Sequence, residues 1–306
     1  MTDKRQEIGQ RIRAYRMGAG LSPEEAARRL QISRAALYKY ERTGVVKLET
    51  IERFAQLVGV SSSALLGSGT EYFNSAISFF ERKRQLERDS AQIVSYLEPI
   101  PFLLSSSDYP GHLRQMLVEG LPEQAVARTR ERHHVDALMA ILAERRDDVG
   151  RRHTSNISLI GAVQVERFLH TGLIGTYDLS GAVLEERRSF ARREVERLVA
   201  LLEREPLGIQ IGVVEDTLPN QTFELFKRAN DTLVAVSPYR LGELPNIRRG
   251  VASIIAAPEA VRLYEKLAED LWGVAHRGQD ASALLRRIIK RVSPARAALR
   301  ALSRRK

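Results

Sequence analysis

Basic and hydroxyl side chains gather in one short stretch near the start of the chain, between positions 33 and 47. Arginine has the most specific chemistry among them, because its planar guanidinium can donate two parallel hydrogen bonds to a guanine edge or a phosphate. Arg34 comes early in the stretch, and the two alanines after it permit a close approach. These residue types predict contacts to double-stranded DNA. The candidate residues are Ser33, Arg34, Ala35, Tyr38, Lys39, Arg42 and Lys47.

Two short helices joined by a tight turn must present this stretch. Ser22, Pro23 and Glu25 have the pattern of a helix start, with a capping box and a proline in the first turn. After the turn, Ser33 should cap a second helix over residues 34–41. A helix of this kind enters the major groove of DNA with its first residues at the base edges.

Three further helices are expected around this pair, at about 5–18, 48–58 and 61–66. The segments IGQRIR, GLS, LYKYE and TIERFAQLVGVSSSALL together resemble the Cro/CI-type helix-turn-helix family, also called the XRE family, over residues 5–67. The resemblance implies an all-α, five-helix, lambda-repressor-like domain at residues 1–67. It also implies that this domain reads an operator as a homodimer.

The same resemblance implies a structural brace between Arg16 of the first helix and Glu41 of the recognition helix. The chain departs from the family pattern at Pro23 and Glu24, where a glutamine is frequent. It departs again at Gly44, which follows Glu41 by three residues and not by two. We therefore expect the loop after the recognition helix to differ locally from the family pattern.

Composition excludes several classes of protein. With 43% hydrophobic and 28% charged residues, the chain of 306 residues is neither disordered nor a membrane protein. No apolar run is long enough for a transmembrane helix, and the N-terminus has no secretory signal, so a cytoplasmic protein is expected. The absence of cysteine excludes disulfides, thiol catalysis and cysteine-based zinc sites.

The net charge of +10 is concentrated at the two ends of the chain. Residues 1–67 have 12 Lys and Arg against 7 Asp and Glu, and residues 286–306 have nine basic residues and no acid. A basic small domain beside a mildly acidic body favours a polyanion as partner for the ends. The basic tail at 293–306 is either a solvated end or an auxiliary contact to DNA or an acidic partner.

The rest of the chain divides into two parts by composition. Residues 68–99 predict a helical linker, with one helix of about 25 residues whose aromatic face needs a partner and could serve dimerisation. Residues 100–292 predict a regulatory, sensor-like domain of α/β or α+β class. Helices are expected at 108–119, 122–146, 182–205, 258–276 and 280–292, and strands at 157–163, 207–214, 222–229, 231–237 and 250–257.

This second half resembles, in the segments LLSSSDYPGHLRQML, ARREVERLVALLEREPLGIQIGVV and APEAVRLYEKLAEDLWGVA, a ligand-binding-like domain that follows the same helix-turn-helix in many bacterial regulators. The resemblance implies a sensor for a small-molecule or protein effector. Candidate pocket residues are Tyr239, Arg240 and Trp272, with Arg240 or Arg248 placed to hold an anion.

Known catalytic and metal motifs are absent. His133 and His134 are adjacent, so on a helix they point about 100° apart and cannot share one metal ion. There is no HExxH, GxSxG, Walker or GxGxxG motif, and no histidine has a lysine two residues on. We therefore expect no enzymatic activity, no metal and no cofactor.

The preferred interpretation is a sequence-specific, DNA-binding transcription regulator. An alternative is an antitoxin-like protein-interaction module, whose C-terminal half binds a protein partner. A second alternative is a nuclease-like or lipase-like C-terminal domain, which would require a cluster of His, Asp or Lys side chains in one cleft.

Overall fold

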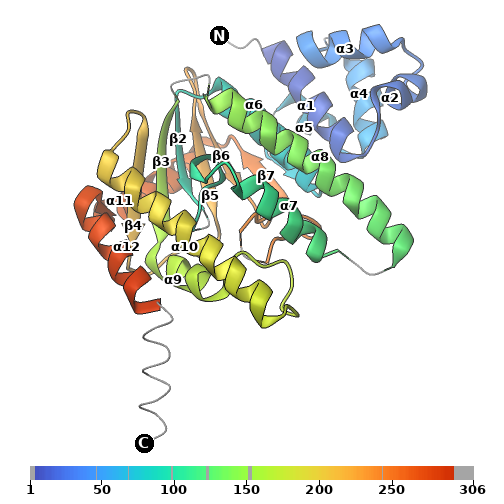
Figure 1. Cartoon of the computed structure of the whole chain (residues 1–306). Coiled ribbons are helices and arrows are strands. Elements are labelled where there is room, and N and C mark those ends of the chain that lie inside the picture. Colours follow the sequence, from blue (N-terminus) through green and yellow to red (C-terminus); the bar gives the residue numbers. More distant parts are fainter. Residues whose placement is uncertain are drawn as a thin grey trace, which may run out of the picture.

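The computed structural model describes residues 4–45, 47–67, 69–97, 99–121, 124–150, 154–242 and 244–292. The predicted basic tail at 293–306 lies outside these residues. A helical N-terminal domain packs against a larger domain that is built on a mixed sheet (Figure 1). This arrangement confirms the predicted combination of an all-α N-terminal domain with a mixed α and β C-terminal domain.

The N-terminal domain consists, in its described part, of α1 (Lys4–Gly18), α2 (Pro23–Arg29), α3 (Arg34–Thr43), α4 (Leu48–Val58) and α5 (Ser62–Leu66). The predicted caps are present. The Ser22 hydroxyl accepts from the Glu25 amide at 3.1 Å, and the Ser33 hydroxyl accepts from the Ala36 amide at 3.1 Å. Leu37 and Phe54 are fully buried in the centre of the domain.

The larger domain is organised by a sheet of eight described strands in the order β1-β7-β6-β5-β2-β3-β4-β8. Strands β2, β3 and β4 run parallel, and the other neighbours are antiparallel. The bounds are β1 (Glu71–Phe73), β2 (Gln92–Tyr96), β3 (Ser155–Gly161), β4 (Ile209–Val214), β5 (Phe223–Lys227), β6 (Thr232–Val236), β7 (Ala252–Ile255) and β8 (His276–Arg277).

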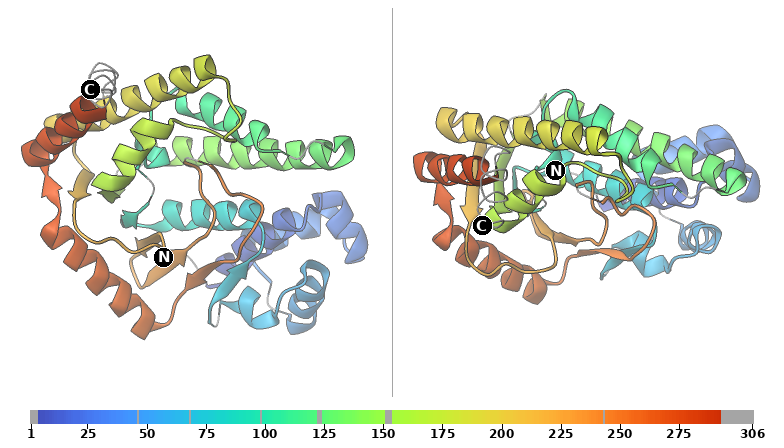
Figure 2. Two further views of the ribbon diagram at one scale, coloured as in Figure 1. Left: turned by 90° about the horizontal axis from the view of Figure 1, so that it is seen from below. Right: turned by 60° about the horizontal axis from the view of Figure 1, so that its bottom comes forward.

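Helices cover both faces of the sheet. One face carries α6 (Ala76–Asp89), the 3-10 helix η1 (Phe102–Leu104), α7 (Tyr109–Glu119), α8 (Ala125–Gly150), α9 (Ala162–Thr171), α10 (Gly181–Arg204) and α12 (Gly278–Val292). The opposite face carries α11 (Pro258–Val274) (Figure 2). On the first face, one apolar cluster is continuous from Ile12 in α1 to Ile288 in α12, so the two domains share a core.

The prediction of one long helix within 68–99 is wrong. The described residues form β1, α6 and β2 instead, and both strands pair within the central sheet. Of the aromatic side chains that suggested an unpartnered helix face, Phe73, Phe79 and Phe80 are buried inside this chain, whereas Tyr72 is exposed. Phe73 stacks on Tyr15 of α1 at 5.0 Å, and Phe79 and Phe80 are at most 3% exposed. Tertiary packing therefore overrides the helical periodicity of this segment.

The expected strand at 157–163 is present but ends at Gly161, where α9 begins. That helix was not expected from the sequence. The remaining predicted helices and strands of the second half correspond to α7, α8, α10, α11, α12, β4, β5, β6 and β7. In the described part of the chain, no helix is both long and apolar enough to cross a membrane.

Candidate nucleic-acid interface

Helix α3 lies at the outer edge of the N-terminal domain, away from the sheet (Figure 1). Its inner side is held by Leu37, which is fully buried, and by Tyr40, whose ring meets Phe54 edge-on at 6.4 Å. Its outer side faces solvent. All the predicted contact residues are exposed there or beside it: Ser33, Arg34, Ala35, Tyr38, Lys39, Arg42 and Lys47.

The turn between α2 and α3 fixes the angle of these two helices. Gln31 takes a left-handed backbone with φ of 54°, and the Ile32 amide donates to the Ala27 carbonyl at 3.0 Å. Arg53 of α4 donates to the Leu30 carbonyl at the end of α2. The turn is therefore held by a backbone hydrogen bond and by a side-chain hydrogen bond from α4, so α3 keeps one orientation relative to α2.

Arg16 and Glu41, the residues expected to brace the domain, form a buried bidentate ion pair between α1 and α3. Arg16 Nε lies 2.5 Å from Glu41 Oε1, and Arg16 Nη2 lies 3.2 Å from Glu41 Oε2. Arg16 Nη1 also donates to the Leu21 carbonyl at 2.7 Å. Both side chains are at most 7% exposed. A buried pair of this geometry orients the helix and leaves its outer face free for other contacts.

Arg34 has two partners on the exposed surface of the N-terminal domain. Its Nη1 lies 2.9 Å from Glu24 Oε1, and its Nη2 donates to the Tyr38 hydroxyl at 3.1 Å. The hydrogen bond to Tyr38 and the negative charge of Glu24 raise the pKa of the Arg34 guanidinium. Sequence reasoning noted Glu24 as a departure from the family pattern but did not place it against Arg34. Any base or phosphate bound by Arg34 must compete with this carboxylate.

The loop after α3 is built around Gly44, which has φ of +80°. A Cβ added here would lie 1.8 Å from the Arg5 carbonyl oxygen, so only glycine fits. Beyond the loop, Lys47 is the N-cap residue of α4 but makes no side-chain cap hydrogen bond. The positive side chain of Lys47 therefore stands exposed at a helix N-terminus, a position suited to a phosphate.

A hollow of about 720 Å³ lies beside the outer side of α3 and extends to the second domain. Its walls come from α3, α1 and α6. The cationic side chains on it are Arg13, Lys39, Arg42, Arg84 and Arg88. Three of these are matched by acids, because Glu81 pairs with both Arg13 and Arg84 at 3.0 Å, and Arg88 Nε lies 3.8 Å from Asp89 Oδ1. Helix α6 of the second domain thus contributes to the surface next to α3, which the sequence did not indicate.

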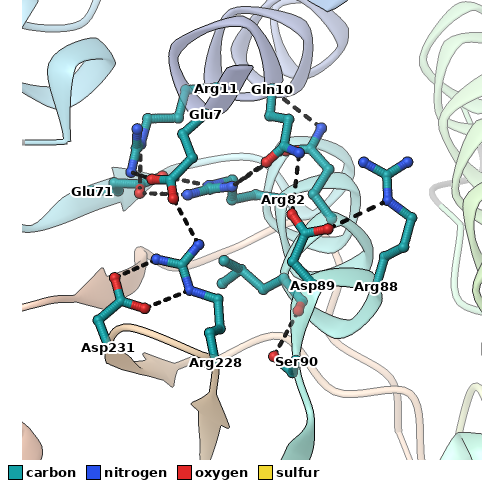
Figure 3. A network of polar contacts seen from close by, with 12 residues as sticks. Glu7, Gln10, Arg11, Glu71, Arg82, Arg88, Asp89, Ser90, Arg228 and Asp231 are labelled. Atoms are coloured by element: carbon teal, nitrogen blue, oxygen red, sulfur yellow. Dashed lines mark hydrogen bonds and ion pairs between the residues drawn. The ribbon is translucent and has the colours of Figure 1, made fainter. Parts of the chain in front are cut away.

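A buried polar network joins the two domains (Figure 3). Glu71 of β1 accepts from Arg11 Nε at 2.8 Å and from Arg82 Nε at 2.9 Å. Burial alone would raise the pKa of Glu71, but Arg82 and Arg11 lower it to about 2. Gln10 connects the same network to α6, because its Oε1 accepts from Arg82 Nη1 at 3.3 Å.

The network continues through Glu7 to the turn between β5 and β6. This carboxylate lies 3.1 Å from Arg11 Nη2 and 2.9 Å from Arg228 Nη1, and Arg228 in turn pairs with Asp231 (Figure 3). Helix α1 is thus tied both to α6 and to the residues between β5 and β6. The position of the N-terminal domain is set by the second domain through these contacts.

The three candidate ligand residues do not converge. Tyr239 is buried on the α6 face of the sheet and donates to the Gly250 carbonyl at 2.9 Å. Trp272 packs with the core on the α11 face, where the Arg277 guanidinium lies 5.3 Å from its ring. Arg240 is exposed, and its backbone pairs with that of Asn246.

Among the described residues, no group of three His, Asp or Glu side chains is arranged to hold a metal ion. His134 lies 3.7 Å from Glu131 on the same helix, at the surface.

Residues 7–66 match the family model described as a helix-turn-helix domain. These residues form a helix-turn-helix domain. The match covers α1 to α5 apart from the first residues of α1, and so includes α3 and both partners of the Arg16–Glu41 brace. A search of curated proteins found no match to the chain. A helix-turn-helix domain indicates a DNA-binding protein, with α3 as its recognition helix.

Proposed function

We propose that this protein is a sequence-specific transcription regulator of the Cro/CI, or XRE, type that acts in the bacterial cytoplasm. The observation that carries the proposal is the exposed outer side of α3, where arginine, tyrosine and lysine side chains lie on a helix that is braced from behind. The protein acts by binding DNA and catalyses no reaction.

Arg34 is the principal base-reading residue in this proposal. Its position in the first turn of α3 is the one that reaches base edges when such a helix enters the major groove. Ala35 allows close approach, and Tyr38 and Lys39 lie about one turn further along the same side. Binding exchanges the Arg34–Glu24 pair for a guanine edge, so specificity depends on this exchange.

Ser33, Arg42 and Lys47 position the domain through phosphates. Ser33 and Lys47 stand at the N-termini of α3 and α4, where backbone amides and the helix dipole favour an anion. The protein binds a partly palindromic operator as a homodimer, with half-sites about 34–36 Å apart, as helix-turn-helix dimers do. The second domain sets the spacing and orientation of the two helix-turn-helix domains in the dimer. The buried hydrogen bonds of Glu71 to Arg11 and Arg82, which tie α1 to the second domain, support this role.

The decisive experiment is selection of bound sequences from a random DNA pool by the full chain at stated salt, followed by affinity measurements. Arg34→Ala should weaken binding to the selected site and lose preference at one base pair per half-site, by about 1–3 kcal/mol. Arg262→Ala is the control, because Arg262 is an exposed arginine on α11, remote from α3. If no sequence is enriched, or if Arg34→Ala weakens all sequences equally, base reading by Arg34 is wrong.

A further inference from the structure

The hollow of about 720 Å³ beside α3 presents positive charge to solvent. Its two acids are buried, because the side chains of Glu41 and Glu81 are 5% and 0% exposed. Four of its five cations reach solvent, namely Arg13, Lys39, Arg42 and Arg88. A ligand that approaches from solvent therefore meets basic side chains, and the acids lie behind them.

The acids around the hollow do not cancel this charge. Among the described residues, no acid forms an ion pair with Lys39 or Arg42. When the ion-pair partners that lie outside the hollow are counted as well, cations still outnumber acids by one. Those partners are Arg16, Asp89, Glu144 and Asp148. An anion can therefore bind at Lys39 and Arg42 without displacing a carboxylate.

Insertion of α3 into DNA brings a phosphodiester strand to this hollow. An α-helix with its side chains is about 10–12 Å wide, and the major groove is about 12 Å wide. The two phosphodiester strands that border the groove therefore run along the two sides of an inserted helix. One side of α3 is the side of the hollow, which Ala35, Tyr38, Lys39 and Arg42 line.

Arg88 brings the second domain to the same hollow. It lies in the last turn of α6, and its Nε is 3.8 Å from Asp89 Oδ1. The two terminal nitrogens of its guanidinium point away from Asp89 (Figure 3). A guanidinium in this orientation offers a pair of donors in the fork geometry that matches a phosphate.

The position of α6 relative to α3 is fixed by contacts through α1. Gln85 Nε2 of α6 donates to the Gln10 carbonyl at 3.1 Å, and Gln10 Nε2 donates to Asp89 Oδ2 at 3.2 Å. Helix α1 in turn holds α3 through the buried Arg16–Glu41 pair. The cations of α3 and α6 therefore face the hollow in one arrangement, so binding of a phosphodiester strand needs little reorganisation.

We propose that the second domain is part of the DNA-binding surface, and that Arg88 of α6 contacts the phosphodiester strand that borders the groove occupied by α3. Arg13 of α1 and Arg42 of α3 contact the same strand from the other walls of the hollow. These contacts are independent of base sequence, so they add affinity and fix the angle at which α3 enters the groove. The inference rests on the proposed function, because it requires DNA on α3.

The contact is tested by the affinity of the full chain for the selected DNA site over a series of salt concentrations. Arg88→Gln should weaken binding at least about threefold and reduce the slope of log affinity against log salt by about 0.9, with base preference unchanged. Arg88→Lys keeps the charge and should keep the wild-type salt slope. Arg262→Gln, at an exposed arginine on α11, is the control and should bind like the wild type. Wild-type affinity and salt slope in Arg88→Gln would overturn the proposal.

Methylphosphonate substitution, which removes the charge of one phosphate in the DNA, separates a direct contact from an indirect effect. At the phosphate that Arg88 contacts, the substitution should weaken wild-type binding at least about threefold and leave binding by Arg88→Gln nearly unchanged. If every substitution weakens both proteins by the same factor, Arg88 does not contact the backbone and the proposal is wrong.

Gln6 provides a test that removes no charge from the protein. It is exposed on α1 and lines the same hollow. Gln6→Lys should tighten binding at least about twofold with a steeper salt slope, and Gln6→Glu should weaken binding by a similar factor. This pair tests the hollow even where Arg88→Gln fails to fold. Equal affinities of the two Gln6 variants would mean that no phosphodiester strand lies over the hollow.

Failure of this inference and failure of the proposed function give different results. If the wild-type chain selects a DNA site, and Arg88→Gln and both Gln6 variants bind that site like the wild type, the second domain does not contact DNA. Base reading by α3 is unaffected by that outcome. If the wild-type chain enriches no DNA sequence, the proposed function fails, and this inference fails with it.

Discussion

Arg34 Nη1 lies 2.9 Å from Glu24 Oε1, so the side chain that we propose to read DNA bases is held by a carboxylate of the neighbouring helix. Both side chains are more than half exposed, which makes the pair weak and exchangeable. If Arg34 reads DNA as proposed, DNA must displace Glu24 from it. A ligand that competes for Arg34 must offer a better-oriented acceptor than Glu24, which a guanine edge does and an arbitrary anion does not.

Removal of the Glu24 carboxylate, which competes with DNA for Arg34, should tighten DNA binding. We expect Glu24→Gln to raise affinity for the selected site about twofold to fivefold, because an exposed ion pair is worth about 0.2–1 kcal/mol. Fluorescence anisotropy at fixed salt measures the change. Glu52→Gln, an exposed acid on α4 of the same domain, is the control and should have a smaller effect. Unchanged or weaker binding by Glu24→Gln would show that Glu24 does not restrain Arg34 in solution.

Lys47 should behave as a phosphate contact. Lys47→Ala is expected to weaken binding to all sequences alike and to reduce the slope of log affinity against log salt by about 0.9. Affinities for the selected site and for a scrambled site, measured over a series of salt concentrations, test this expectation. A loss confined to one base pair, with an unchanged salt slope, would assign Lys47 to base reading.

The buried carboxylate at the domain junction should control stability. Glu71→Gln leaves Arg11 and Arg82 buried without a counter-charge, so we expect a loss of about 3–5 kcal/mol in unfolding free energy at neutral pH. Urea denaturation measures this loss of unfolding free energy. Glu269→Gln, an exposed acid on α11, is the control and should unfold like the wild type.

Glu71→Gln also tests how the free energy of unfolding depends on pH. The pKa of Glu71 is lowered from an ordinary 4.5 to about 2, so its charged form stabilises the fold fully above about 4.5. That contribution disappears as the pH falls from about 4.5 to about 2. The stability gap between the wild type and Glu71→Gln should therefore narrow over this range. A gap that stays constant with pH would mean that the charge of Glu71 is not the source of the difference.

Phe73 should couple the folding of the two domains. It is 1% exposed and packs between Tyr15 of α1 and Phe79 of α6, with ring distances of 5.0 Å and 6.1 Å. Phe73→Ala should cost about 3–5 kcal/mol and separate one calorimetric transition into two, because it removes shared core. Tyr72→Ala in the same strand is the matched control, since that side chain is 63% exposed. A single transition in Phe73→Ala would show that the polar network alone couples the domains.

Local signals in the sequence were sufficient for the helix-turn-helix domain. Ser22 and Ser33 mark the starts of α2 and α3 because a hydroxyl cap acts within three residues of itself. The family pattern also named Arg16 and Glu41, which form the buried brace between α1 and α3. These features depend on neighbours close in sequence or on a pattern that covers the whole small domain.

Contacts between residues far apart in the sequence determine the features that local sequence patterns did not predict. Glu71, Arg82 and Lys83 look like solvated charges in the sequence, yet each is buried, because its partner comes from a different segment of the chain. The composition of residues 68–99 predicts one helix of about 25 residues, whereas sheet pairing splits the segment into β1, α6 and β2. Strand register is a property of the folded sheet, so no local pattern could have predicted it.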